Sequence, residues 1–174
     1  LAALSIVLAG VACRGGDEPV GPLIEKAGRP ITPVVGVNRL IDMLDHAWVS
    51  VPAGKVKEFA GVAECRFLLL PAEYAGLVKT LALGHAEAEL EVSRAIFAPV
   101  PSTYAFEMDV PPGAVLETGF GVGAYPDGKT ALPADFQVAI ATGPGERTVL
   151  MDASAEAGEA AWKRSSVDLS AFAG

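Results

Sequence analysis

The sequence predicts a mainly all-β protein, an antiparallel β-sandwich or jelly roll with a short helix near residues 38–47. Apolar and polar residues alternate strictly over residues 104–110, which is typical of a strand with one buried face. Short apolar runs elsewhere are separated by turns that contain proline and glycine. Strands and helices do not alternate along the chain, as a doubly wound parallel sheet would require.

Composition limits the function classes. The 174 residues suit one domain with a tail, and 51% hydrophobic against 20% charged residues allow a real core. The formal net charge of −8 disfavours nucleic-acid binding, which usually needs a basic face. Two histidines and two cysteines leave little material for zinc or for a disulfide framework.

The first twelve residues, Leu1 to Ala12, carry no charge and are almost wholly small or apolar. As a helix they would rise ~18 Å, too short for the ~30 Å hydrocarbon core of a bilayer. The length suits the apolar h-region of a secretory signal peptide, without the basic residues that usually precede it. We therefore expect residues 1–12 to be an export signal, with a buried first strand as the alternative.

Cys13 follows the apolar run directly, after Gly10, Val11 and Ala12. This arrangement resembles a bacterial lipobox, in which cleavage leaves the cysteine as a lipidated N-terminus, although leucine is usual where Gly10 stands. More than one acyl chain on Cys13 would anchor the protein stably to a membrane. Residues 13–33 are rich in Gly, Pro and charge and predict a flexible tether to a domain at 34–174. Secretion without lipidation is the alternative.

The helix is expected at residues 38–47 because Leu40, Ile41 and Leu44 share one helical face, with Asn38 as the N-cap. Residues 48–51 read as extended. The apolar run 64–70 predicts a strand buried on both faces, and residues 73–78 predict a helical turn. In the second half of 81–92, apolar residues alternate with glutamates, which favours another strand.

Five strands follow, at residues 104–110, 115–124, 136–140, 148–152 and 162–169. Pro111, Pro112 and Gly113 predict the first turn, since proline presets φ and glycine supplies a positive φ. Further turns are expected at 125–129, 143–145 and after Asp168, and a loop at 153–160. We expect the sandwich to lack its last strands beyond Gly174.

Three glycines, Gly119, Gly121 and Gly123, recur at every second position. A nucleotide-binding loop would open a helix, whereas a turn follows here. The period of two instead puts the glycines on one face of a strand, which favours close packing against another backbone, with a ligand face as the alternative.

Residues that could bind metal are sparse. His46 and His85 lie among acidic residues without the convergent spacing that zinc needs. No cofactor is expected, with a structural calcium ion as the alternative. Its candidate ligands are the aspartates near strand ends, Asp127, Asp135, Asp152 and Asp168. Cys65 is expected to be a buried thiol, or to pair with Cys13 if that residue is not lipidated.

No catalytic centre is recognisable. Ser102, Ser165 and Ser166 lack the G-x-S-x-G elbow of serine hydrolases, and no acidic pair has a glycosidase context. Aromatic side chains could serve as platforms on which a sugar stacks, and the alternative role is in the core. These candidate platforms are Trp48, Trp162, Tyr104 and Tyr125.

Three blocks of sequence resemble one family. Residues 98–121 contain APVPS, VPPGA and LETGFG, residues 162–174 run from a tryptophan to VDLSAFAG, and residues 38–50 begin with NRLID. Together they resemble the N-terminal jelly-roll region that precedes the catalytic domain of some bacterial, often lipoprotein-type, sulfatases. The sulfatase signature C/S-x-P-S-R is not matched by Cys65, Arg66 and Phe67, so no catalytic residue is carried over.

The resemblance implies a non-catalytic accessory module of an exported envelope protein, periplasmic or at the cell surface. Its partners would be the membrane, through the lipid on Cys13, and a sulfatase-type catalytic domain downstream in the same polypeptide. Two alternatives remain open. One is a carbohydrate-binding module with a polysaccharide partner, and the other is a stand-alone envelope lipoprotein with a scaffold role.

Overall fold

The structure is a computed structural model that describes residues 4–11, 23–52, 78–83, 91–96, 101–122, 133–143, 145–156 and 162–174. Strands dominate this part of the chain, which confirms the all-β class. The strands are β1 (Leu4–Val11), β2 (Leu23–Lys26), β3 (Trp48–Pro52), β4 (Val78–Leu83), β5 (Glu91–Ile96), β6 (Ser102–Met108), β7 (Val115–Phe120), β8 (Ala134–Gly143), β9 (Glu146–Ala155) and β10 (Lys163–Asp168). Two short 3₁₀ helices are η1 (Leu40–His46) and η3 (Ser170–Phe172).

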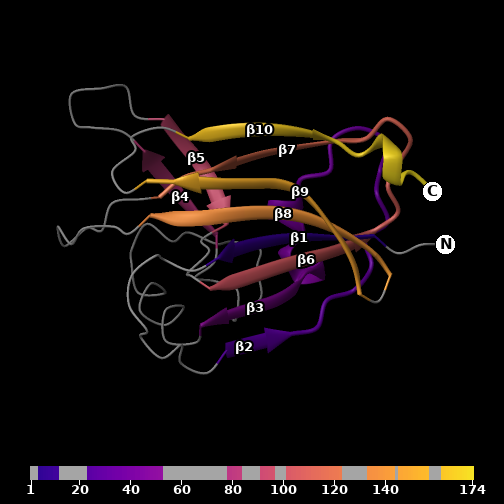
Figure 1. Cartoon of the computed structure of the whole chain (residues 1–174), viewed down its shortest axis with the longest axis horizontal. Coiled ribbons are helices and arrows are strands. Elements are labelled where there is room, and N and C mark those ends of the chain that lie inside the picture. The colour runs from indigo at the N-terminus through magenta and orange to yellow at the C-terminus, as the bar shows by residue number, and fades with distance from the viewer. Residues whose placement is uncertain are drawn as a thin grey trace.

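The largest unit is a six-stranded sheet in the order β2-β3-β6-β1-β8-β9, with every neighbouring pair antiparallel. Figure 1 shows these strands following one another across the molecule, with β7 and β10 beyond β9. The strands β7 and β10 form a separate antiparallel pair, as do β4 and β5. The sheet is antiparallel throughout, and its described strands are not joined in the βαβ order of a parallel sheet, as the sequence predicts.

The apolar segment at the start of the chain forms β1, in the middle of the sheet. Residues 4–10 pair with β6 and residues 5–11 pair with β8, seven register pairs on each side. A central strand and the apolar core of an export signal need the same uncharged composition. In this structure the apolar run thus forms a strand that pairs on both sides within the large sheet.

The second part of the predicted tether, from Leu23 on, lies against the sheet, and its first part lies outside the described residues. Strand β2 pairs with β3, and the next residues run beside η1. The N–H of Arg29 donates to the carbonyl of His46 at 2.9 Å, and the N–H of Ile31 donates to Glu107 at 2.7 Å. Ile31 is buried in the core. Residues 23–33 are thus part of the domain.

The predicted helix is a 3₁₀ helix with a break at Met43, where φ and ψ are −117° and 22°. Leu44 is fully buried and Leu40 and Ile41 pack against the core, so the apolar face is confirmed. The predicted N-cap is wrong: the cap position is Arg39, without a side-chain bond. The Asn38 side chain instead binds the backbone N–H and carbonyl of Val34, at 3.0 and 2.9 Å. Four-residue loops closed by asparagine compete with helix capping in this way.

Strand β6 supplies the centre of the core. Its burial alternates as predicted, with Tyr104, Phe106 and Met108 buried and Thr103, Ala105 and Glu107 half-buried. Val49 of β3 and the β8 residues Val138 and Ile140 join the same cluster. The expected half-buried strand at 104–110 is confirmed.

The small β7–β10 sheet packs over the large one. The rings of Phe120 on β7 and Phe136 on β8 have centroids 4.9 Å apart and are tilted by 32°. Leu116 and Val167 also pack against the core cluster. Two sheets joined by side chains in this way support a sandwich architecture.

Strands β8 and β9 pair irregularly. The register shifts between Val138 and Ala139, where Leu150 is the extra residue on β9, and again between Ala141 and Gly143. Such β-bulges interrupt the ladder and increase the local twist. The expected loop at 153–160 begins later than predicted, because β9 continues to Ala155.

The turn between β6 and β7 depends on a glycine. The N–H of Ala114 donates to the carbonyl of Pro111 at 3.1 Å, and Gly113 has a φ of +71°. Changing Gly113 to alanine is expected to lower the free energy of unfolding by about 1 kcal/mol, because a Cβ disfavours this conformation. Urea unfolding measures the change. Gly113→Asn should lose less free energy of unfolding, because asparagine tolerates a positive φ. An alanine variant as stable as the parent would contradict the turn geometry.

Candidate functional site

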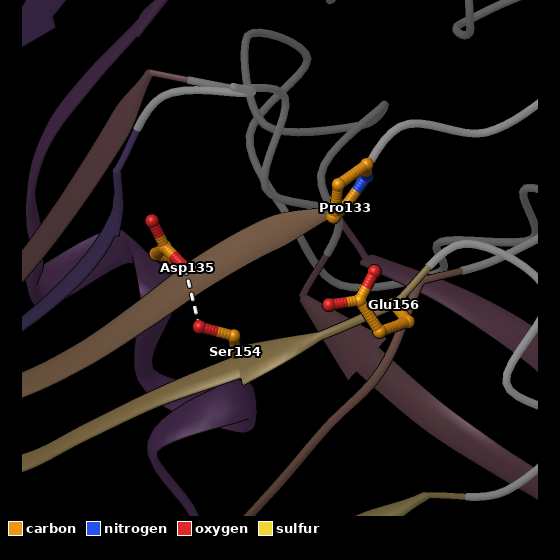
Figure 2. Close-up of a pocket in the computed structure, with 4 residues that line it drawn as sticks. All are labelled: Pro133, Asp135, Ser154 and Glu156. Atoms are coloured by element: carbon orange, nitrogen blue, oxygen red, sulfur yellow. Dashed lines mark hydrogen bonds between the residues drawn. The ribbon is translucent and has the colours of Figure 1, made fainter. Parts of the chain in front are cut away.

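A cavity of about 210 Å³ lies at the adjoining ends of β8 and β9. It is lined by Pro133, Asp135, Ser154 and Glu156. Figure 2 shows Asp135 and Ser154 facing each other across the two strands, with Pro133 and Glu156 just outside the strand ends. Asp135 is in register with Ser154 and also with Val11, the last residue of β1.

The chemistry of this cavity is that of a polar cross-strand contact. The Ser154 hydroxyl donates to the Asp135 carboxylate at 2.5 Å, and the Lys163 ammonium donates to the Ser154 carbonyl at 2.8 Å. A nucleophilic serine needs a base that accepts its proton, usually a histidine held by a third group. Here the hydroxyl donates to the Asp135 carboxylate, and no histidine is among the residues that line the cavity. This geometry supports joining the strand ends more than it supports catalysis.

The aspartates considered for calcium do not converge within the described residues. Asp135 lies in the cavity and Asp152 is exposed in the middle of β9. Asp168 ends β10 in the other sheet, and Asp127 lies outside the described part of the chain. No group of three or more His, Cys, Asp or Glu side chains able to hold a metal ion is found among the described residues.

Asp168 instead closes the turn into η3. Its carboxylate accepts the N–H of Ser170 at 2.8 Å. The Ser170 hydroxyl, and after it the Ser170 N–H, lower the pKa of the Asp168 carboxyl below its usual range, against a weaker effect of burial. Because the folded-state pKa is lowered, the stability this contact adds is present above the unfolded pKa and is lost as pH falls through the folded value.

We expect an NMR titration to place the Asp168 midpoint below ~3.9, the value of an unstructured aspartate. Ser170→Ala should move the midpoint upward, since it removes the larger of the two causes. Ser166→Ala, on an exposed position of β10, is the matched control and should leave it in place. An unchanged midpoint in Ser170→Ala would contradict the hydroxyl contact.

The four candidate sugar platforms are separated. Tyr104 is 1% exposed and belongs to the core, so it is not a platform. Trp48 is half-buried on β3, and Trp162 is half-buried beside β10, in a different sheet. Tyr125 lies outside the described residues. The structure therefore does not bring the described candidates together on one face.

Burial also sets the chemistry of the Tyr104 hydroxyl. Loss of solvent raises the pKa of Tyr104 far above its usual range, and the nearby Ser102 hydroxyl offsets this only in part. Ser102 is itself buried, two positions earlier on the same strand. Burial thus disfavours the charged form of this phenol, which packs in the core.

Close packing against another backbone, the favoured explanation for the glycines at every second position, does not occur at Gly119. A Cβ added to Gly119 would meet the Lys163 carbonyl at 3.7 Å and Cε3 of Trp162 at 4.0 Å, both ordinary contacts. Gly121 follows the end of β7, and Gly123 lies outside the described residues. The close approach that needs a glycine occurs instead at Gly28, which sequence patterning did not single out.

His46 has local partners. Its Nδ1 lies 3.3 Å from the Pro30 carbonyl, and its Nε2 lies 3.7 Å from the Asp45 carboxylate. Asp45 also pairs with Arg29 at 2.6 Å. Exposed pairs of this kind contribute little to stability. The second histidine and both cysteines, His85, Cys13 and Cys65, lie outside the described residues.

Sequence reasoning missed two features. One is the cavity, because Asp135 and Ser154 are 19 positions apart and meet only through strand register. The other is an apolar loop in which Val34, Val35 and Val37 are exposed while Asn38 holds the backbone. A run of valines next to Pro33 was the available signal for this loop.

Within the described residues, no helix is long and apolar enough to cross a bilayer. No protein-family model, curated protein or solved structure matches the chain.

Proposed function

We propose that the chain is a non-catalytic β-sandwich module of an exported bacterial envelope protein, anchored through a lipid on Cys13. Its role is to support a hydrolase domain in the same polypeptide, with a sulfatase-type domain as the specific candidate. The observation that carries the proposal is the uncharged run from Leu1 to Ala12 placed directly before Cys13. This order of segments is the one that an exported lipoprotein needs.

The chemistry of the described surface supports an accessory role. At the β8–β9 cavity, the Ser154 hydroxyl donates to the Asp135 carboxylate, and the lining residues do not include the histidine that usually serves as the base of a serine nucleophile. The sequence blocks at 38–50, 98–121 and 162–174 resemble the jelly-roll region ahead of sulfatase catalytic domains. An acidic, strand-rich module between a lipid and an enzyme would hold the enzyme at a distance from the membrane.

Changing Cys13 to serine is expected to release the protein from membranes, because serine cannot form the thioether that carries the diacylglycerol. Membrane and soluble fractions of a bacterial host that expresses the full gene measure the partition, with a shift from mostly membrane-bound to mostly soluble. Cys65→Ser is the matched control and should stay membrane-bound. Retention of Cys13→Ser in the membrane fraction would overturn the anchor.

The link to a hydrolase is tested separately by the gene itself. A C/S-x-P-S-R signature in the reading frame beyond Gly174 supports the accessory role, and a stop codon directly after Gly174 overturns it. Binding of the isolated chain to a polysaccharide array, lost in Trp48→Ala or Trp162→Ala, would favour the carbohydrate-binding alternative instead.

A further inference from the structure

The apolar run that the proposed function assigns to export is also the central strand of the large sheet. Residues 4–10 pair with β6 and residues 5–11 pair with β8, so both backbone edges of β1 are engaged. Figure 1 shows β1 between these two neighbours in the middle of the molecule. One segment thus has two uses, and both uses need the same residues.

Pairing on both sides makes the two uses exclusive. An export signal is recognised as a free apolar segment that precedes its cleavage point. In β1 the backbone N–H and carbonyl groups that another protein would bind already pair with β6 and β8. Breaking these pairs while the sheet stays closed would leave buried backbone groups without partners, which is costly. The folded chain therefore withholds the segment from other proteins.

We propose that the fold masks its own export signal: once β6 and β8 have closed on β1, the chain is no longer a substrate for export. This inference rests on the proposed function, because it takes residues 1–12 as the signal. It adds a time limit to that function, since export has to begin before the sheet is complete.

The residues that face β1 indicate how firmly the mask is closed. Ile6 is in register with Phe106 on one side and with Ile140 on the other. Phe106 and Ile140 are both at most 1% exposed. A central strand between buried neighbours opens only when the sheet itself opens, whereas a strand at the end of a sheet can separate alone. Unmasking β1 thus requires unfolding of the large sheet.

The order of synthesis leaves time for export before the mask closes. Strand β1 is made first, whereas β6 begins at Ser102 and β8 begins at Ala134. At roughly 5–20 residues per second, the chain from β1 to β8 takes on the order of ten seconds to make. Pairs between residues so distant in sequence also form late in folding, because a long loop has to be closed first. The segment is thus free during synthesis and masked after folding.

Hydrogen exchange of the purified chain of residues 1–174 tests the mask directly. We expect the amides of residues 4–11 to exchange as slowly as those of β6 and β8, about 1,000-fold or more below the rate of an unstructured peptide, because all of them open only in global unfolding. Exchange of residues 4–11 at the rate of an unstructured peptide, in a chain whose β6 is protected, would overturn the proposal.

A delayed-export experiment tests the consequence in a bacterial host. The chain is synthesised while export is reversibly blocked, export is then restored, and the membrane-bound fraction is measured. The parent chain, which folds during the block, should reach the membrane at least about five-fold less than Ile140→Glu, in which a buried unpaired charge keeps the sheet from closing. Thr148→Glu is the matched control, at the exposed register partner of Ile140 on β9, and should behave as the parent does.

The outcomes separate the mask from the signal. If the parent and Ile140→Glu reach the membrane equally after the delay, the mask is overturned and the signal stands. If neither reaches the membrane even when export is never blocked, residues 1–12 are not a signal and the proposed function itself is wrong. If Ile140→Glu is degraded before export is restored, Phe106→Ala, a milder opening of the same sheet, replaces it in the comparison.

Discussion

Replacing Phe106 by alanine is expected to lower the free energy of unfolding by about 4 kcal/mol, because it deletes one of the largest fully buried side chains among the described residues. Phe106 is fully buried at the centre of β6, between β3 and β1 in the large sheet. The deletion removes apolar surface from the core and leaves a cavity that rigid neighbouring strands cannot fill. Since domains of this size are stable by roughly 5–15 kcal/mol, the loss is a large part of the total.

Urea unfolding followed by circular dichroism measures the effect. Val149→Ala, on β9, is the matched control, because Val149 is 47% exposed and should lose less than about 0.5 kcal/mol. If Phe106→Ala does not fold, Phe106→Leu supplies the graded comparison, with an expected loss below about 1.5 kcal/mol. Equal stability of Phe106→Ala and Val149→Ala would contradict the placement of β6 in the core.

Changing Gly28 to alanine is expected to lower the free energy of unfolding by about 3 kcal/mol. The reason is the opposite of that for Phe106→Ala, because here an atom is added where no space exists. A Cβ at this position would overlap the His46 carbonyl oxygen and lie 2.6 Å from backbone atoms of Ala47 and Trp48. Backbone atoms cannot rotate away as a side chain can. Relief would require residues 28–31 to move off η1, which would break the bonds from Arg29 to His46 and from Ile31 to Glu107.

Gly119→Ala is the matched control for this prediction. The added Cβ there meets only ordinary contacts, and alanine loses less backbone entropy on folding than glycine does. We expect Gly119→Ala to be neutral or to gain about 0.5 kcal/mol. The two variants, compared by thermal unfolding, should therefore change in opposite directions, and a similar loss in both would indicate a general intolerance of alanine rather than a close approach at Gly28.

The elements that the sequence predicts best are those whose burial changes with every residue. Alternation from Tyr104 to Val110 identifies β6 and its buried face, and prolines with Gly113 identify the turn that follows. The apolar face of η1 is likewise visible at Leu44. In these segments the spacing of apolar side chains along the chain matches their burial in the fold. The sequence pattern is therefore enough to predict the element and its buried face.

Other elements depend on contacts between distant residues. An unbroken apolar run such as Leu4–Val11 has no period, so composition cannot distinguish an export signal from a central strand. Asn38 was expected to cap η1, but the local bonds to Val34 were stronger competitors. The β8–β9 cavity and the close approach at Gly28 arise only from strand register and chain crossing. No local pattern reports either of them.

The irregular pairing of β8 with β9 has a consequence for how the protein behaves among many copies of itself. Strand β9 is one of the two outer strands of the six-stranded sheet, and outer strands can recruit further strands into growing fibrils. The extra residue Leu150 and the exposed charges of Glu146 and Arg147 disturb the flat, regular surface that such growth requires. The bulged strand thus disfavours the edge-to-edge pairing through which strand-rich proteins polymerise at high concentration.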